Sequence, residues 1–105
     1  MSGVHPASTT HPRRELDDLL QHGVRLSVLA ALRAVDRAEF SLIRDTLQIS
    51  DSVLSKQMTL LESAGYLRVE KGHVGKRPRT WLSLTSGGAD ALKRHLAALR
   101  SIAGD

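Results

Sequence analysis

Polar side chains that could contact a nucleic acid are concentrated between residues 50 and 59 of this 105-residue chain. They are hydroxyls, an amide, a carboxylate and a lysine, and such groups hydrogen-bond to phosphates and base edges. Lys56 and Gln57 are long enough to reach base edges. The candidate contact residues are Ser50, Asp51, Ser52, Ser55, Lys56, Gln57 and Thr59. On an isolated amphipathic helix they would be an ordinary solvated surface, so their sequence context decides between the two interpretations.

Basic residues that could hold a polyanion follow at 66–79. This segment has five basic residues and one acidic residue, whereas the basic and acidic side chains of the rest of the chain cancel. The whole formal excess of +4 therefore lies here. Because charge clustered on one loop favours a polyanionic partner, we expect the loop to contact DNA phosphates or enter the minor groove. Its candidate residues are Lys71, Gly72, His73, Lys76, Arg77 and Arg79, and the alternative is a solvated hairpin tip.

Catalytic and metal-binding patterns are missing from the sequence. The chain has no cysteine, which excludes disulfides and thiolate sites. Its five histidines are scattered without a pair at i,i+4, and no ligand cluster accompanies them. There is no nucleophile elbow, phosphate-binding glycine loop or paired-acid arrangement. We therefore expect a protein that is not an enzyme and has no metal or cofactor.

Length and composition favour one small domain. The chain is 41% hydrophobic with one Phe, one Tyr and one Trp, so the core should consist of aliphatic residues on helices. No stretch approaches a membrane span, and the start lacks the apolar region of a signal peptide. Residues 1–13 have no periodicity and are expected to be a disordered tail, with the domain at 14–103. We expect a cytoplasmic protein without a membrane partner.

The 50–59 candidates require a helix that presents them outward. Leu54, Met58 and Leu61 recur at intervals of four and three, which predicts an inward face for a helix over 51–64. Ser50 is well placed as its N-cap, and Gly65 suits the left-handed position after its end. A shorter helix is expected at 42–47, with Ser41 as its N-cap and a turn at 48–49. Two helices joined by a tight turn are typical of a helix-turn-helix.

The basic residues require a β-hairpin. Alternating apolar residues predict strands at 66–70 and 80–84. The connection over 72–79 is too long for a two-residue turn and is expected to be a mobile loop. A helix-turn-helix followed by such a hairpin is the arrangement that lays one helix in the major groove of DNA.

Apolar stripes on the remaining helices could join two chains. Helices are expected from about residue 14 to 20 and from 24 to 35, with Gly23 interrupting the first. Thr85 or Ser86 is expected to cap a last helix that runs to about residue 102, with Gly87–Gly88 fraying its first turn. The last helix has a heptad-like stripe from Ala89 to Ala103. It could pack within the chain or form a two-fold dimer interface, and we favour the dimer. The candidate interface residues are Leu16, Leu19, Leu20, Leu92, Leu96 and Leu99.

Two motifs carry a resemblance to a known class of proteins. The segments LSKQMTLLESAGYL at 54–67 and RTWLSLTSGG at 79–88 resemble small single-domain winged helix-turn-helix transcriptional regulators related to the MarR and ArsR families. The resemblance covers about residues 14–103. It implies a mainly helical α+β fold with a two-stranded wing and terminal dimerisation helices. It also implies a homodimer that binds operator DNA, with the helix from Asp51 reading bases and the wing holding the backbone.

The function predicted from the sequence is sequence-specific binding of double-stranded DNA by a homodimeric transcriptional regulator, which represses by occupying promoters. One alternative is a winged-helix module for protein–protein assembly. Another is a sensor that adds ligand or metal binding to DNA binding. The sequence does not name an operator, a regulated gene or a small-molecule effector.

Overall fold

The computed structural model describes residues 11–104 of the chain, so most of the predicted tail lies outside the described residues. Two 3₁₀ helices come first, followed by four α-helices and three strands. In chain order these elements are η1 (Pro12–Glu15), η2 (Asp18–Gln21), α2 (Gly23–Leu32), β1 (Ala38–Glu39), α3 (Phe40–Leu47), α4 (Asp51–Ser63), β2 (Leu67–Val74), β3 (Arg77–Leu84) and α5 (Ser86–Ala103). The mainly helical α+β class predicted from the sequence is confirmed.

The N-terminal segment differs from its prediction. The single helix expected over residues 14–20 is replaced by η1 and η2, because short polar side chains cap each turn locally. His11 accepts from the backbone N–H of Arg13, and Asp17 accepts from that of Leu19. Such local bonds compete with a continuous helix. Gly23 begins α2 instead of interrupting a helix, and α2 ends at Leu32, not near residue 35.

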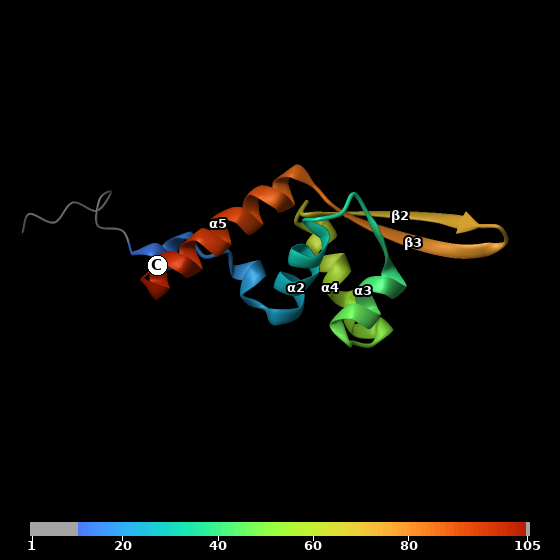
Figure 1. The fold of residues 1–105 in the computed structure, drawn as a ribbon, viewed down its shortest axis with the longest axis horizontal. Helices are drawn as coiled ribbons and strands as arrows, with labels where there is room; N and C mark the ends of the chain where they lie inside the picture. The colour runs from blue at the N-terminus through green and yellow to red at the C-terminus, as the bar shows by residue number, and fades with distance from the viewer. Residues whose placement is uncertain (1–10, 105) are drawn as a thin grey trace, which may run out of the picture.

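The strands form one antiparallel sheet in the order β1-β3-β2. The pairs Leu67–Leu84 and Val69–Leu82 place their apolar side chains on the face toward the helices. The sheet has one strand more than expected, because Ala38 and Glu39 pair with β3 opposite Leu82 and Trp81. Beyond the core, β2 and β3 continue as a two-stranded wing that projects away from the helices (Figure 1).

The core lies between α2, α3, α4, the first half of α5 and the inner face of the sheet. Apart from His95, its fully buried side chains are aliphatic, as the composition predicts. They include Leu20, Val28, Leu29, Leu32, Leu54, Leu61 and Leu82. In Figure 1, α2, α3 and α4 lie together beneath the base of the wing, and α5 runs away from it along the N-terminal segment. The core therefore fixes α4 beside the wing.

Helix α5 begins in close contact with the end of α4. The Thr85 side chain caps its N-terminus by accepting from the backbone N–H of Gly88 at 2.9 Å. The expectation that Gly87–Gly88 would fray this end is wrong for Gly88, which is buried against the backbone of Tyr66. A Cβ at Gly88 would lie only 2.1 Å from the Tyr66 carbonyl oxygen. The missing side chain therefore permits this close packing.

A polar network joins the N-terminal segment to α5 and the start of β2. The backbone N–H of Asp17 donates to Nδ1 of His95 at 3.0 Å, and the Tyr66 hydroxyl donates to Oδ2 of Asp17 at 2.5 Å. His95 is almost fully buried on α5. The pKa of the Tyr66 hydroxyl is raised, mainly because it donates a hydrogen bond to the Asp17 carboxylate and secondly because it is partly buried. These bonds tie together residues from three separate parts of the chain.

Replacing Tyr66 with Phe should lower the free energy of unfolding by about 1–2 kcal/mol near pH 7, because a hydrogen bond to a charged group is lost. A group whose pKa is raised in the folded protein stabilises the fold at any pH below its pKa in the unfolded chain, which for tyrosine is about 10. This stabilisation is lost as the pH rises through the pKa of the group in the folded protein. Denaturant unfolding of both proteins from pH 7 to 11 should therefore show their difference narrowing above about pH 10. A constant difference would contradict this role of the Tyr66 hydroxyl.

Candidate nucleic-acid interface

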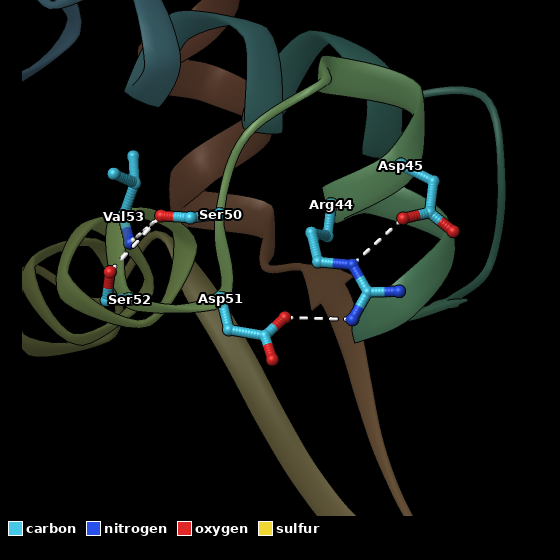
Figure 2. A network of polar contacts seen from close by, with 6 residues as sticks. All are labelled: Arg44, Asp45, Ser50, Asp51, Ser52 and Val53. Carbon is cyan, nitrogen blue, oxygen red and sulfur yellow. Dashed lines mark hydrogen bonds and ion pairs between the residues drawn. The ribbon is translucent and has the colours of Figure 1, made fainter.

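The turn between α3 and α4 is built by local polar contacts. Gln48 ends α3 in a left-handed conformation with φ of 57°. Ser50 then caps α4, since its hydroxyl accepts from the backbone N–H of Val53 at 3.2 Å. The hydroxyls of Ser50 and Ser52 are hydrogen-bonded to each other at 3.1 Å, and Figure 2 marks this contact with a dashed line. The predicted helix-turn-helix is therefore present, with Ser50 as the N-cap that the sequence indicated. The expectation of Ser41 as the N-cap of the shorter helix is wrong, because α3 begins at Phe40 with Glu39 in the N-cap position.

An arginine on α3 forms an ion pair with a carboxylate in the first turn of α4. Arg44 donates from Nε to Asp45 at 2.9 Å and from Nη1 to Asp51 at 2.8 Å (Figure 2). The hydrogen bond from Arg44 lowers the pKa of the Asp45 carboxyl. Asp51 was predicted to contact DNA, and the structure places its carboxylate on Arg44. In this position the Asp51 carboxylate interacts favourably with the positive end of the α4 dipole and links the first turn of α4 to α3.

The outer face of α4 carries most of the predicted contact residues. Ser52, Ser55, Lys56 and Thr59 are exposed there, and Leu54 and Leu61 are buried on the opposite side. The Thr59 hydroxyl donates to the backbone carbonyl of Ser55 at 3.0 Å. The exposed strip is therefore polar, with one cation near the middle of the helix.

Gln57 does not lie on this face, and its assignment as a base-reading residue is wrong. Its side chain is buried, with 7% exposed, and its Oε1 accepts from Nη1 of Arg25 at 2.8 Å. The reason is its position, three residues after Leu54 and four before Leu61, which places it on the inward side. The spacing from Leu54 and Leu61 indicates an inward position, whereas the polarity of glutamine favours an exposed one.

Arg25 on α2 is a structural residue that the sequence analysis missed. Its Nε donates to the carbonyl of Leu19 at 2.6 Å while its Nη1 binds Gln57. It therefore connects the N-terminal segment, α2 and α4. No local signal identifies it, because Gln57 lies 32 residues away along the chain.

The wing ends in a tight turn, and the prediction of a mobile loop over 72–79 is wrong. β2 continues to Val74 and β3 begins at Arg77, so only Gly75 and Lys76 form the turn. Gly75 has a φ of 63°, whereas the φ of Lys76 is negative. This combination fits a type II′ hairpin turn, in which Gly occupies the first turn position. Such a turn matches the right-handed twist of paired strands. The hairpin is longer than expected because both strands extend to the two turn residues.

The basic residues of the wing occupy different positions. Lys76 and Arg77 are exposed at the tip, and Lys71 and His73 are exposed on β2. Gly72 lies opposite Arg79 in the ladder. Because side chains alternate along a strand, Lys71 and His73 share the face of Leu67 and Val69, whereas Arg77 lies on the other face. Among residues 11–104, no carboxylate forms an ion pair with either cation at the tip.

Arg79 lies at the base of the wing, and its assignment as a free phosphate contact is corrected. Its Nε donates to Oε1 of Glu39 at 3.1 Å, and its Nη1 donates to the carbonyl of Pro78. Only 29% of its side chain is exposed. Glu39 lies on β1, which pairs beside β3, so the sheet brings the two charges together.

The predicted dimer residues also separate into two groups. Leu20 and Leu92 are buried within the single chain, at 0% and 2% exposed, so neither is free to form an interface. This part of the prediction is wrong, because the N-terminal segment, α2 and α5 of one chain already enclose them. Leu16, Leu19 and Leu96 are half-buried. Leu99, by contrast, is exposed near the end of α5.

Residues 11–104 contain no group of three or more His, Cys, Asp or Glu side chains that could hold a metal ion. Within the same residues, no helix is long and apolar enough to cross a membrane.

Comparison with known proteins agrees with the geometry of the helix-turn-helix and wing. Residues 24–103 match the family described as winged helix DNA-binding domain. An uncharacterized protein of Methanocaldococcus jannaschii is 27% identical over 73 residues, which cover 70% of this chain and 79% of that protein.

Solved structures share the fold. A transcriptional regulator homologue from Pyrococcus horikoshii OT3 is 27% identical with a TM-score of 0.79, and the match covers 87% of this chain and 91% of that one. A PadR family transcriptional regulator from Eggerthella lenta is 25% identical with a TM-score of 0.68, covering 82% and 80% of the two chains. A MarR family regulator from Silicibacter pomeroyi shares the fold at 23% identity and a TM-score of 0.66, covering 87% and 60%. Helix α4 is capped and exposed beside a cationic wing, and the family match covers most of the chain. This chain therefore belongs to the winged helix DNA-binding domain family.

Proposed function

We propose that this protein is a transcriptional regulator that binds double-stranded DNA in a sequence-specific manner. Helix α4 enters the major groove and reads base edges with Ser52, Ser55, Lys56 and Thr59. The wing lies along the backbone, where Lys76 and Arg77 contact phosphates. The observation that carries this proposal is the exposed polar face of α4 beside a wing tip with two free cations. Phosphate contacts set the position and base contacts set the specificity.

Relatives support a regulatory role and repression is its simplest form. The Pyrococcus horikoshii protein is described as a transcriptional regulator homologue and the Eggerthella lenta protein as a PadR family transcriptional regulator. Repression requires only that a bound protein occupies a promoter, so the DNA-binding surface is sufficient for it.

We further propose that the protein acts as a homodimer through the end of α5. Leu99 and Ile102 follow the buried His95 by four and seven residues, so they lie on the same side of the helix. They are nevertheless 39% and 43% exposed, because α5 extends beyond the helices that cover its first half (Figure 1). Leu16 of the N-terminal segment is half-buried nearby, since η1 packs on α5. A two-fold axis there would place two α4 helices on one duplex.

Selection of bound sequences from a random duplex pool tests these proposals together. The expected result is a palindrome with half-sites about one helical turn apart. Enrichment of a single half-site would reject the dimer and keep the DNA-binding function. Val53 and Leu60 on α4 are each 39% exposed, which favours an alternative in which α4 docks on a protein. A pool without any enriched sequence would support that alternative.

Replacing Lys56 with Ala should relax sequence preference at one base position of each half-site, with a loss of about 1–3 kcal/mol of discrimination. Lys93 on α5 provides a matched control, because Lys93→Ala removes the same charge away from α4. Competition binding with single-base operator variants measures both proteins. If Lys56→Ala weakened all sequences equally, Lys56 would be a phosphate contact and its base-reading role would be rejected.

A further inference from the structure

Two apolar side chains on α4 remain exposed, and the polar base contacts proposed above do not account for them. Val53 and Leu60 are each 39% exposed. They lie three residues before and four residues after Lys56, so the three side chains form one edge of the helix. The inward face is formed by Leu54 and Leu61, which are fully buried. This edge is therefore apolar surface that the described part of the chain leaves exposed.

Val53 lies in the first turn of α4 and is held in a fixed position. Its backbone N–H donates to the hydroxyl of Ser50 at 3.2 Å, so the cap of the helix sets its backbone. Because valine branches at Cβ, its side chain has one strongly preferred rotamer in a helix. Its two methyl groups therefore point in a fixed direction. In helix-turn-helix proteins, the N-terminal residues of the second helix are the ones that contact base edges.

The charge of this edge favours DNA over a protein as its partner. Lys56 lies within the edge and forms no ion pair among residues 11–104. The Asp51 carboxylate of the same helix is already paired with Arg44 at 2.8 Å. An apolar protein surface would bury the Lys56 charge without a partner, which is costly. The major groove instead offers acceptor atoms on guanine, and phosphate oxygens lie beside it.

We propose that Val53 recognises the C5-methyl group of a thymine in the operator. This inference rests on the proposed function and names one base that the protein reads. Among the four bases, only thymine presents a methyl group in the major groove. Contact between this group and the Val53 methyls removes apolar surface from water, which favours thymine at that position. Leu60 lies roughly 10 Å farther along the helix axis, so it does not reach the same methyl group.

Replacing thymine with deoxyuridine tests the proposal, because it removes the methyl group and keeps the hydrogen-bonding groups of the base. An operator selected from a random duplex pool is prepared with each thymine replaced in turn. Fluorescence anisotropy measures its binding to the full-length protein. One replacement should weaken binding about fourfold, the value that corresponds to burying one methyl-sized group. Equal affinity for every replaced operator would overturn the proposal.

Variants then assign the methyl contact to a side chain. Val53→Ala should bind the thymine and deoxyuridine operators equally, since it lacks the valine methyls that make the contact. Leu60→Ala is the matched control, because it removes an equally exposed apolar side chain from the same edge. It should retain the difference of about fourfold between the two operators. A difference of that size in Val53→Ala would assign the contact to another residue and reject the role of Val53.

The same measurements separate this inference from the proposed function. An enriched operator whose thymines can all be replaced without loss of affinity rejects the methyl contact and leaves sequence-specific binding intact. A pool without any enriched sequence rejects sequence-specific binding and the methyl contact together. The apolar edge would then remain for a protein partner.

Discussion

Replacing Lys76 and Arg77 together with Ala is expected to weaken binding to every duplex and to flatten its salt dependence. The logarithm of the affinity falls linearly with the logarithm of the salt concentration, with a slope of about 0.9 per phosphate neutralised. Loss of two contacts should therefore reduce the magnitude of the slope by about 1.8. Both side chains are exposed at the wing tip, so their removal should leave the fold intact.

Arg79→Ala provides the comparison, because it removes one positive charge from the base of the same wing. Its guanidinium is held by Glu39, so the pair is already close to neutral. We expect a change in slope smaller than the value of about 0.9 per contact expected for the tip variant. Fluorescence anisotropy with one operator and one unrelated duplex, over roughly 50–200 mM salt, measures all the proteins. An unchanged slope in the tip variant, or an equal loss in Arg79→Ala, would remove the wing tip from DNA binding.

Replacing Gly88 with Ala should produce the largest loss of stability among the substitutions considered, about 3 kcal/mol or more. The new Cβ would lie 2.1 Å from the carbonyl oxygen of Tyr66 and 2.9 Å from Cδ1 of Leu84. A flexible side chain could move away, but the carbonyl belongs to the backbone that leads from α4 into β2. Relief therefore requires α5 to shift, and the contacts of Leu92 and His95 with the core would be disturbed.

Gly87→Ala is the matched control, one residue away on the same helix turn. Its Cβ would lie 3.5 Å from the nearest backbone atom, which is ordinary contact, and the residue is exposed. Alanine favours a helix over glycine, so this variant should gain about 0.5 kcal/mol. Urea denaturation of the two variants separates the effects. Similar stabilities for Gly88→Ala and Gly87→Ala would show that the close approach at Tyr66 is not required.

Local signals in the sequence predicted much of the scaffold correctly. Ser50 caps α4 and Thr85 caps α5, and Gly65, with a φ of 80°, follows the end of α4. These predictions succeed because a cap or a left-handed turn depends on a few neighbouring residues. The third strand and the tight turn at the wing tip were missed, since strand pairing depends on a partner elsewhere in the chain.

The candidate site shows the same division. The sequence alone determined that α4 has a polar outer face and that the wing carries the excess positive charge, because periodicity and charge are properties of a local segment. Only the tertiary structure decided which polar groups remain available. Gln57 is held by Arg25 across 32 residues, and Arg79 is held by Glu39 across 40. Folding brings these partners together. A side chain that is already hydrogen-bonded within the protein has fewer free groups with which to contact DNA.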